Sequence, residues 1–251
     1  MFEKNSFIPF VTAGFPDLET TRDIVLGLAE AGSGLIEIGI PFSDPIADGP
    51  VIQQASFDAL QHGYTISDYL EMVRDVRSKT AVPLIFMTYL NPVLRFGLER
   101  LDREGSQAGL NGLLISDLTP EESHVGLSIV ESIHELKSVL LVAPTSSPER
   151  IHRICEAATG FIYMVARTGV TGRQSQVGDA ARRIVGQIRS STHLPVAVGF
   201  GIRSREDVER VWEFAEGAVV GTAIVRFMQE NVDEHDLSQR VVDFVKRQFL
   251  G

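Results

Sequence analysis

The chain has 251 residues, of which 44% are hydrophobic and 22% charged, as in an ordinary globular protein without a long disordered tail. Its 33 acidic residues outnumber its 23 lysines and arginines, which gives a net charge of −10. Such a surface repels nucleic-acid backbones and anionic membranes, so neither is expected as a partner.

The single Cys155 cannot form an internal disulfide, and its helical surroundings favour a small buried hydrophobe in a reducing compartment. No stretch has the apolar length of a membrane span, and residues 1–10 lack the pattern of a signal peptide. We therefore expect a cytoplasmic protein, or a mature form whose transit peptide has been removed.

Eight short apolar runs, rich in β-branched and aromatic residues and bounded by Gly, Pro or Asp, predict strands along the chain. They cover residues 7–13, 35–42, 82–90, 112–118, 138–144, 161–168, 194–202 and 217–225. Longer segments between them have apolar residues at helical spacing, for example 17–32 and 204–217. A glycine is expected to end the helix before the next strand at Gly32, Gly109, Gly160 and Gly217.

The repeating unit is therefore a strand followed by a helix. Nearly continuous apolar strands with crossover helices are typical of a parallel sheet that is covered on both faces. Eight such units predict a closed (β/α)8 TIM barrel of the α/β class rather than an open doubly wound sheet. No linker or change of composition divides the chain, so residues 1–251 are expected to form a single TIM-barrel domain.

The segment LIEIGIPF, residues 35–42, carries a carboxylate within an apolar strand. A period of two places its isoleucines on the face toward the helices, and Glu37 and Gly39 on the face toward the interior. Gly39 is expected to leave room there for a ligand. Interior carboxylates are scarce unless they are paired or catalytic, and no Lys or Arg lies in the inner half of the neighbouring strands. We favour a catalytic role for Glu37, with a pKa raised by burial.

Asp48, in the loop FSDPIADGP, allows two interpretations. Its carboxylate either caps the helix that begins near Pro50 or reaches over the mouth of the barrel, and its position alone does not choose. Tyr163 is expected to point inward, and a large core residue is as compatible with its pattern as a site residue. Asp117 ends the fourth strand at the same mouth.

Glycine-rich segments near the last strands, GVTGRQSQVG, VGFGI and VVGTAIV, predict a phosphate site made of backbone amides. Residues 168–179 are expected to form a lid over the mouth, or else a solvated loop. The segment GFGIRS lacks the third glycine of a dinucleotide fingerprint, so NAD is not expected. The histidines have no paired ligand spacing, so no metal site is predicted.

Six segments together resemble the tryptophan synthase alpha chain, in order from about Pro9 to Ile224: PFVTAGFP, LIEIGIPFSDPIADGPVIQ, MTYLNPV, ARTGVTG, GFGI and VGTAIV. The resemblance implies a lyase that cleaves indole-3-glycerol phosphate to indole and glyceraldehyde 3-phosphate in tryptophan biosynthesis. It implies that Glu37 protonates C3 of the indole and helps to remove a hydroxyl proton of the glycerol chain. Asp48 would accept a hydrogen bond from the indole N–H and stabilise the developing positive charge.

The same resemblance assigns further residues to the site. Tyr163 corresponds to an active-site tyrosine, and Thr171 to a lid threonine that orients Asp48. The groups expected to bind the substrate phosphate are Gly172, Gly201, Gly221 and Thr222. The residues expected to form apolar walls around the indole are Phe10, Leu90 and Ile52.

Members of this family normally work with a beta chain, in an alpha2-beta2 tetramer whose beta chain carries pyridoxal phosphate. No cofactor is expected in this chain, and the loops SDPIADGP and LNPV would face the partner. Some relatives instead act alone and release indole, and the sequence does not decide between these two modes.

Two other functions are alternatives: a non-catalytic family member, and a generic phosphate-binding barrel such as an isomerase or an aldolase. Intact Glu37 and Asp48 argue against a non-catalytic family member, and a Schiff-base aldolase would need an interior lysine, which the chain lacks. The chain also departs from the family at Thr119, where proline is usual, and at Thr222, where serine is common. Family members begin with an extra helix before the first strand, so we expect a more exposed barrel base here.

Overall fold

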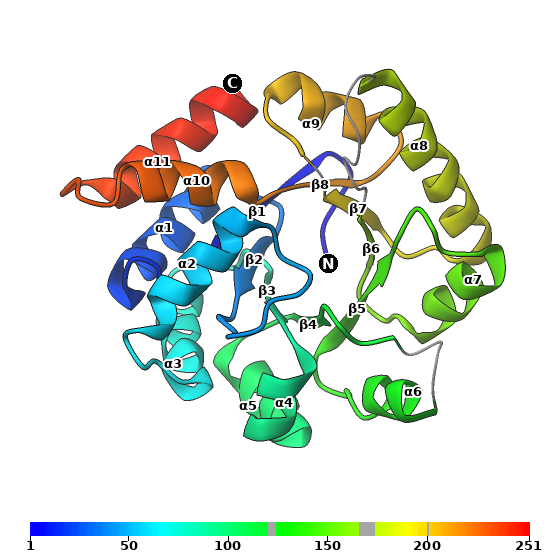
Figure 1. The fold of residues 1–251 in the computed structure, drawn as a ribbon, viewed down its shortest axis with the longest axis horizontal. Coiled ribbons are helices and arrows are strands. Elements are labelled where there is room, and N and C mark those ends of the chain that lie inside the picture. The colour runs from blue at the N-terminus through cyan, green and yellow to red at the C-terminus, as the bar shows by residue number, and fades with distance from the viewer. Residues whose placement is uncertain (120–123, 166–173, 200) are drawn as a thin grey trace.

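A computed structural model describes residues 1–119, 124–165, 174–199 and 201–251. Within this part of the chain, eight parallel strands close into a barrel in sequence order, with β1 pairing with both β2 and β8 (Figure 1). The strands are β1 (Ser6–Thr12), β2 (Ile36–Gly39), β3 (Leu84–Thr88), β4 (Gly112–Ile115), β5 (Lys137–Val142), β6 (Ile162–Val165), β7 (Val196–Gly199) and β8 (Gly217–Val220). The predicted TIM barrel is confirmed, and each predicted strand overlaps one of these, although several predicted strands run beyond its carboxyl end.

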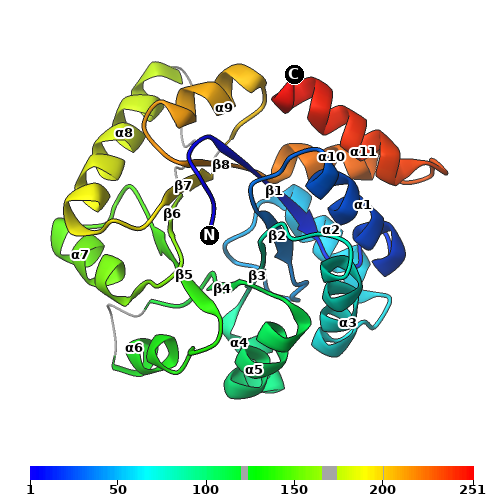
Figure 2. The ribbon, with the colours of Figure 1, turned by 180° about the vertical axis from the view of Figure 1, so that it is seen from behind.

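The helices surround the strands, as both faces of the barrel show (Figures 1 and 2). The first six are α1 (Leu18–Glu30), α2 (Pro50–Leu60), α3 (Ile66–Arg77), α4 (Leu90–Phe96), α5 (Leu98–Ala108) and α6 (His124–Glu131). The remainder are α7 (Pro148–Ala157), α8 (Gln174–Ser191), α9 (Arg205–Trp212), α10 (Thr222–Glu230), α11 (Leu237–Val245) and the π-helix η1 (Lys246–Leu250). None of the helices in the described ranges is both long and apolar enough to cross a membrane.

Alternation along the strands separates two apolar clusters. Leu35 belongs to the small cluster inside the barrel, whereas Ile36 and Ile38 belong to the large cluster that includes the helices. The same period of two places Phe161, directly before β6, and Tyr163 of β6 on the inner face of the barrel. The predicted direction of β2, with its isoleucines outward, is therefore confirmed.

The last predicted strand, 217–225, is too long at its carboxyl end. β8 ends at Val220, and α10 begins at Thr222. The β-branched residues of TAIV suit either structure, but Ile224, Val225 and Met228 form a buried stripe at helical spacing. Packing of that stripe selects the helix, and it brings a helix N-terminus to the carboxyl end of β8.

The base of the barrel is covered by the first two residues, contrary to the expectation of an exposed base. Phe2 is buried inside the barrel and packs edge-to-face on Phe161, with 5.0 Å between ring centroids. The N-terminus accordingly lies near the barrel axis (Figures 1 and 2). A β-carbon at Gly160 would lie 2.8 Å from Met1 Sδ, and one at Gly217 would lie 2.9 Å from the Phe2 ring.

These contacts correct two of the four predicted helix stops. Gly32 and Gly109 adopt φ of +93° and +98° directly after α1 and α5, as the prediction requires. Gly160 and Gly217 do not have positive φ, and their role is to let side chains pack closely at the barrel base.

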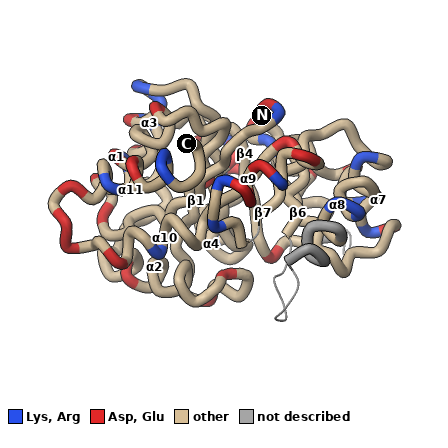
Figure 3. The backbone as a smooth tube through the Cα atoms, turned by 90° about the horizontal axis from the view of Figure 1, so that it is seen from above, with Lys and Arg blue, Asp and Glu red and all other residues tan. Residues whose placement is uncertain are grey.

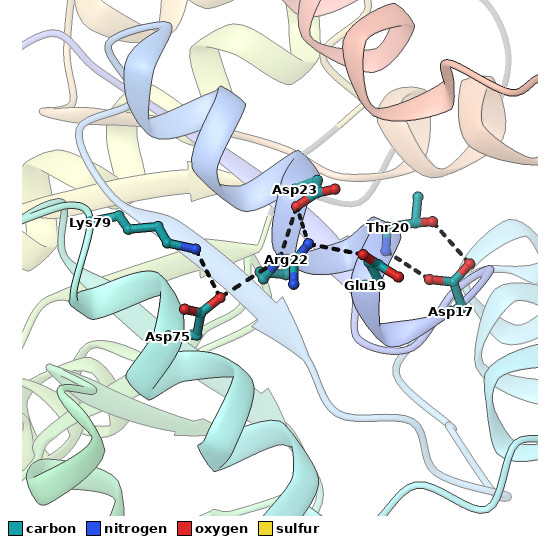
Figure 4. Close-up of polar contacts among 7 residues, drawn as sticks. All are labelled: Asp17, Glu19, Thr20, Arg22, Asp23, Asp75 and Lys79. Carbon is teal, nitrogen blue, oxygen red and sulfur yellow. Dashed lines mark hydrogen bonds and ion pairs between the residues drawn. The ribbon is translucent and has the colours of Figure 1, made fainter.

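Lys and Arg positions alternate with Asp and Glu positions along the outer helices and their loops in the part of the chain drawn in colour (Figure 3). A network of such groups joins α1 to α3 (Figure 4). Arg22 lies 2.8 Å from Asp23 and 3.7 Å from Asp75, which also contacts Lys79 at 3.1 Å. Because these side chains are solvent-accessible, the network contributes little to stability and mainly fixes the two helices side by side.

Candidate active site

Glu37 lies on the inner face of β2, and its side chain is completely buried. Neither carboxylate oxygen has a hydrogen-bond partner among the described residues. Because burial penalises the charged form, the pKa of Glu37 is raised from 4.5 to about 8. Glu37 therefore holds a proton at neutral pH and can donate it to a bound molecule.

The wall beside Glu37 is formed by Phe10, which pairs with it in the register of β1 and β2. A β-carbon at Gly39 would collide with the tip of the Phe10 ring. The space that Gly39 was expected to leave for a ligand is therefore taken by this ring. Gly39 allows the ring to lie against the strand, so that Phe10 forms an apolar surface next to the acid.

Asp48 lies in the loop between β2 and α2 and is half-buried. Its Oδ2 accepts a hydrogen bond of 3.0 Å from the hydroxyl of Tyr89, which in turn accepts the N–H of Ala47 at 3.1 Å. Burial raises the pKa of Asp48 to about 6, and the Tyr89 hydrogen bond opposes part of that rise. Asp48 is thus mainly ionised at neutral pH.

The two interpretations of Asp48 can now be separated. α2 begins at Pro50 with Gly49 as its N-cap, and no side chain caps it. The Asp48 carboxylate instead bonds to Tyr89 at the end of β3, over the mouth of the barrel. Gln53 of α2 donates to the backbone oxygens of Pro45 and Asp48, which fixes the loop to the helix.

Tyr163 points into the barrel from β6, as predicted, and belongs to the inner apolar cluster. Burial raises the pKa of its hydroxyl well above the ordinary value, and the negative charges of Glu37 and Asp48 raise it further. These electrostatic effects indicate that the two carboxyl groups and the tyrosine converge on one region. Gly199 permits this position, because a β-carbon there would collide with the Tyr163 hydroxyl.

The other predicted wall residues lie around the same mouth. Ile52 is on the first turns of α2 and Leu90 is the first residue of α4, and both are partly buried against the main cluster. The backbone N–H of Leu90 donates to Asp117 at 2.7 Å. Asp117 therefore satisfies the exposed N-terminus of α4, which is a structural role.

The predicted phosphate groups lie at the carboxyl ends of β7 and β8. Gly221 is the N-cap of α10 and Thr222 its first residue, and no side chain caps this helix. Its first N–H groups and its dipole can therefore hold an anion. Gly201 has φ of +51° beyond the end of β7. Gly172 and Thr171 lie outside the described residues.

The expected lid, 168–179, is only partly described. Residues 174–179 belong to helix α8, so this part of the predicted loop is wrong. The Gly-, Ser- and Gln-rich composition predicted a loop. The residues that follow have apolar side chains at helical spacing, and the helix that they form begins at Gln174. Residues 168–173 lie outside the described part of the chain.

The sequence prediction missed Tyr89 as a partner of Asp48. The available signal was its position directly after β3, where Ile85 and Met87 face inward and the same period of two, continued by one residue, places Tyr89 inward as well. In the described ranges, no group of three or more His, Cys, Asp and Glu side chains could hold a metal ion. The four lysines, Lys4, Lys79, Lys137 and Lys246, are all exposed.

Fold and site together define a TIM-barrel enzyme with a protonated interior acid, an ionised carboxylate over the barrel mouth and, among the described residues, a helix N-terminus without a side-chain cap at the carboxyl end of β8. A family model described as tryptophan synthase alpha chain matches residues 2–249, and the chain belongs to this family. The chain is therefore a carbon–carbon lyase of tryptophan biosynthesis, which cleaves indole-3-glycerol phosphate to indole and glyceraldehyde 3-phosphate.

Individual relatives are similar to this chain over most of their length. The tryptophan synthase alpha chain of Solibacter usitatus is 41% identical and covers 97% of this chain and 91% of its own. That of Prochlorococcus marinus (strain MIT 9313) is 46% identical over 89% and 81% of the two chains. A Pyrococcus furiosus structure of the tryptophan synthase a2b2 complex has a TM-score of 0.90, with 34% identity and full coverage of both chains.

Proposed function

We propose that Glu37 and Asp48 carry out the cleavage by a retro-aldol route. Glu37 donates its proton to C3 of the indole, and the ring becomes an indolenine cation whose N–H donates to ionised Asp48. The bond between C3 and the adjacent glycerol carbon then breaks, and its electron pair returns to the ring. The hydroxyl on that carbon loses its proton to Glu37 and becomes the aldehyde, which restores the acid.

One observation carries this assignment. Glu37 is fully buried, its carboxyl oxygens have no partner among the described residues, and its pKa is about 8. A buried carboxyl group with these properties is costly to the fold unless a ligand uses it. Asp48 supplies the complementary charge, because its lower pKa of about 6 keeps it ionised while Glu37 is protonated.

The remaining site residues are assigned around this pair. We infer that Phe10, Ile52 and Leu90 contact the indole and that Tyr163 lines the reacting centre. The phosphate would bind at the uncapped N-terminus of α10 through Gly221 and Thr222, with Gly201 beside it. Gly172 as a further phosphate group and Thr171 as a partner of Asp48 are predictions from the sequence alone.

The experiment is to measure indole release from indole-3-glycerol phosphate by Glu37→Gln and Asp48→Asn. Each should stay folded, because the amide is isosteric, and each should lose nearly all turnover. Asp44→Asn is the matched control, since Asp44 lies in the same loop but is exposed. Near-normal turnover by folded Glu37→Gln would remove the acid role from this residue.

We also propose that the chain works with a tryptophan synthase beta chain in an alpha2-beta2 tetramer, as in the Pyrococcus furiosus complex. The support is two large apolar side chains exposed at the barrel mouth, one on the loop after β2 and one on α4, the helix that contains the predicted LNPV loop. Ile46 follows β2 and is 81% exposed, and Leu94 of α4 is 57% exposed. Pyridoxal phosphate would be bound by the beta chain, with no cofactor in this chain. The alternative is a lyase that acts alone and releases indole.

The chain would act as one domain, residues 1–251, because the barrel closes only through the pairing of β1 with β8. We place it in the cytoplasm, where a free and buried Cys155 stays reduced.

A further inference from the structure

The hydroxyl of Thr12 is another buried polar group without a hydrogen-bond partner among the described residues. Thr12 is the last residue of β1 and is only 1% exposed. Its Oγ1 has no hydrogen bond to any described residue. A buried hydroxyl without a partner is destabilising, and such a group in a native structure calls for an explanation.

The side chain of Thr12 faces the interior of the barrel. Along β1, Ile8 belongs to the inner cluster and Val11 to the outer one, and the Phe10 ring lies against Gly39 of β2, so the period of two places Thr12 on the inner face. The register agrees, because Phe10 pairs with Glu37, and Thr12 pairs with Gly39. Thr12 is therefore level with Gly39, the next inward-facing residue of β2 after Glu37, and lies closer to the mouth of the barrel than Glu37.

β1 also lies between the acid and the proposed phosphate site. On one side it pairs with β2, which carries Glu37, and on the other with β8, where Pro9 is level with Val220. A β-carbon on Gly221, the N-cap of α10, would lie 3.2 Å from Phe10 Cβ. Phe10 thus spans the distance between the two subsites, and Thr12 stands above it.

A substrate with its indole against Glu37 and its phosphate at α10 must pass its glycerol chain over the end of β1. That chain carries two hydroxyls. The one on the carbon next to the ring gives its proton to Glu37, and the other is kept in glyceraldehyde 3-phosphate. Since Thr12 lies on the phosphate side of Glu37, it is placed to meet the second hydroxyl.

We propose that the Thr12 hydroxyl binds the glycerol hydroxyl that is retained in glyceraldehyde 3-phosphate, and that it thereby selects substrates bearing this group. This inference rests on the proposed roles of Glu37 and the α10 N-terminus. Thr12 positions the chain and takes no part in proton transfer.

The test compares kcat/KM for four combinations, the wild type and one variant each acting on the full substrate and on one substrate analogue. Thr12→Val removes the hydroxyl at constant shape, and the 2-deoxy analogue of the substrate lacks the retained hydroxyl but keeps the reacting one. The wild type should cleave the full substrate with a kcat/KM about 3- to 10-fold above that of the analogue. Thr12→Val should show the same low kcat/KM for both substrates, because the bond is already lost.

Two further measurements separate this role from a structural one. Thr12→Ser keeps the hydroxyl and should keep the preference for the full substrate. Thr12→Val should melt at the same or a higher temperature than the wild type, because it removes an unpartnered buried hydroxyl.

An equal loss of kcat/KM for both substrates in Thr12→Val would overturn the inference, as would a wild type indifferent to the retained hydroxyl. Parallel measurement of Glu37→Gln keeps the two proposals distinct. If Glu37→Gln is inactive while Thr12→Val retains its preference, only the role of Thr12 is refuted. If Glu37→Gln is active, the chemistry on which the inference rests is refuted.

Discussion

The Tyr89 hydroxyl links the backbone of the β2–α2 loop to the carboxylate of Asp48. It accepts the N–H of Ala47 at 3.1 Å and donates to Asp48 Oδ2 at 3.0 Å. Tyr89 comes from the end of β3 and is only 3% exposed, so a loop carboxylate is fixed to the rigid barrel. The other oxygen of Asp48 has no hydrogen bond among the described residues, which leaves it available to the indole N–H.

Loss of this hydrogen bond should make the Asp48 carboxyl group harder to ionise and should hold it less firmly in position. Tyr89→Phe removes a donor that lowers the pKa of Asp48, so that pKa should rise above about 6. We expect kcat/KM near pH 7 to fall about 10-fold, and the acidic limb of its pH profile to move to higher pH. Tyr64→Phe, between α2 and α3, is the control for a tyrosine hydroxyl outside the site. An unmoved acidic limb would show that Tyr89 does not set the ionisation of Asp48.

The wild-type pH profile should be bell-shaped. Asp48 must be ionised, so kcat/KM should rise as pH increases through about 6. Glu37 must be protonated, so kcat/KM should fall as pH increases through about 8. The measurement is kcat/KM from pH 5 to pH 9.5 at constant ionic strength. An activity that keeps rising above pH 9 would contradict the acid role of Glu37.

Glu37 should also make stability depend on pH. Its pKa in the folded protein, about 8, exceeds the ordinary value of 4.5, so between these values the folded state holds a proton that the unfolded state has lost. The stabilisation from Glu37 is complete below pH 4.5 and decreases as pH rises toward 8, by up to about 1.4 kcal/mol per pH unit. Asp48 has a similar dependence, but its window ends near pH 6.

Glu37→Gln removes this ionisation and isolates its effect. Between pH 6.5 and pH 8.5, the free energy of unfolding should fall in the wild type and change much less in the variant. Denaturant unfolding at a series of pH values measures both. Parallel curves for the two proteins would mean that Glu37 is already ionised in the folded state in this range, so that its pKa is not raised to about 8.

The sequence predicted what depends on local periodicity. Alternation along LIEIGIPF was enough to place Glu37 inside, because a strand has a strict period of two and one face was uniformly isoleucine. The end of β8 was not predictable in this way. The residues TAIV fit a strand or a helix, and only the burial of Ile224 and Val225 against the barrel decides.

Contacts between distant residues were beyond local reasoning. Asp48 could not be assigned to the barrel mouth, because its partner Tyr89 lies 41 residues away. Gly160 and Gly217 looked like helix stops, and their contacts with Met1 and Phe2 appear only when the barrel closes. The missing partner of Thr12 is likewise a property of the assembled interior.

The proposed phosphate site gives a prediction for Gly221. Gly221→Val places a branched side chain beside Phe10 and over the first N–H groups of α10. We expect binding of indole-3-glycerol phosphate and of glyceraldehyde 3-phosphate to weaken by about 10-fold or more, because the anion can no longer approach the amides. Isothermal titration with each ligand measures this. Unchanged affinities in a folded variant would place the phosphate elsewhere.

The exposed residues at the barrel mouth predict where a beta chain docks. Ile46 and Leu94 each leave a large apolar side chain in water, and burying one fully against a partner is worth about 1.5 to 3 kcal/mol. Ile46→Ser and Leu94→Ser should each weaken binding of a beta chain by about 10-fold or more. Neither residue is assigned to the chemistry, so the isolated chain should cleave its substrate as before. Phe57→Ser is the matched control, because Phe57 is 60% exposed but lies on α2, outside the β2–α2 loop and α4. Full beta-chain affinity in both mouth variants would place the docking surface on another face, and no beta-chain binding by the unmodified chain would favour a lyase that acts alone.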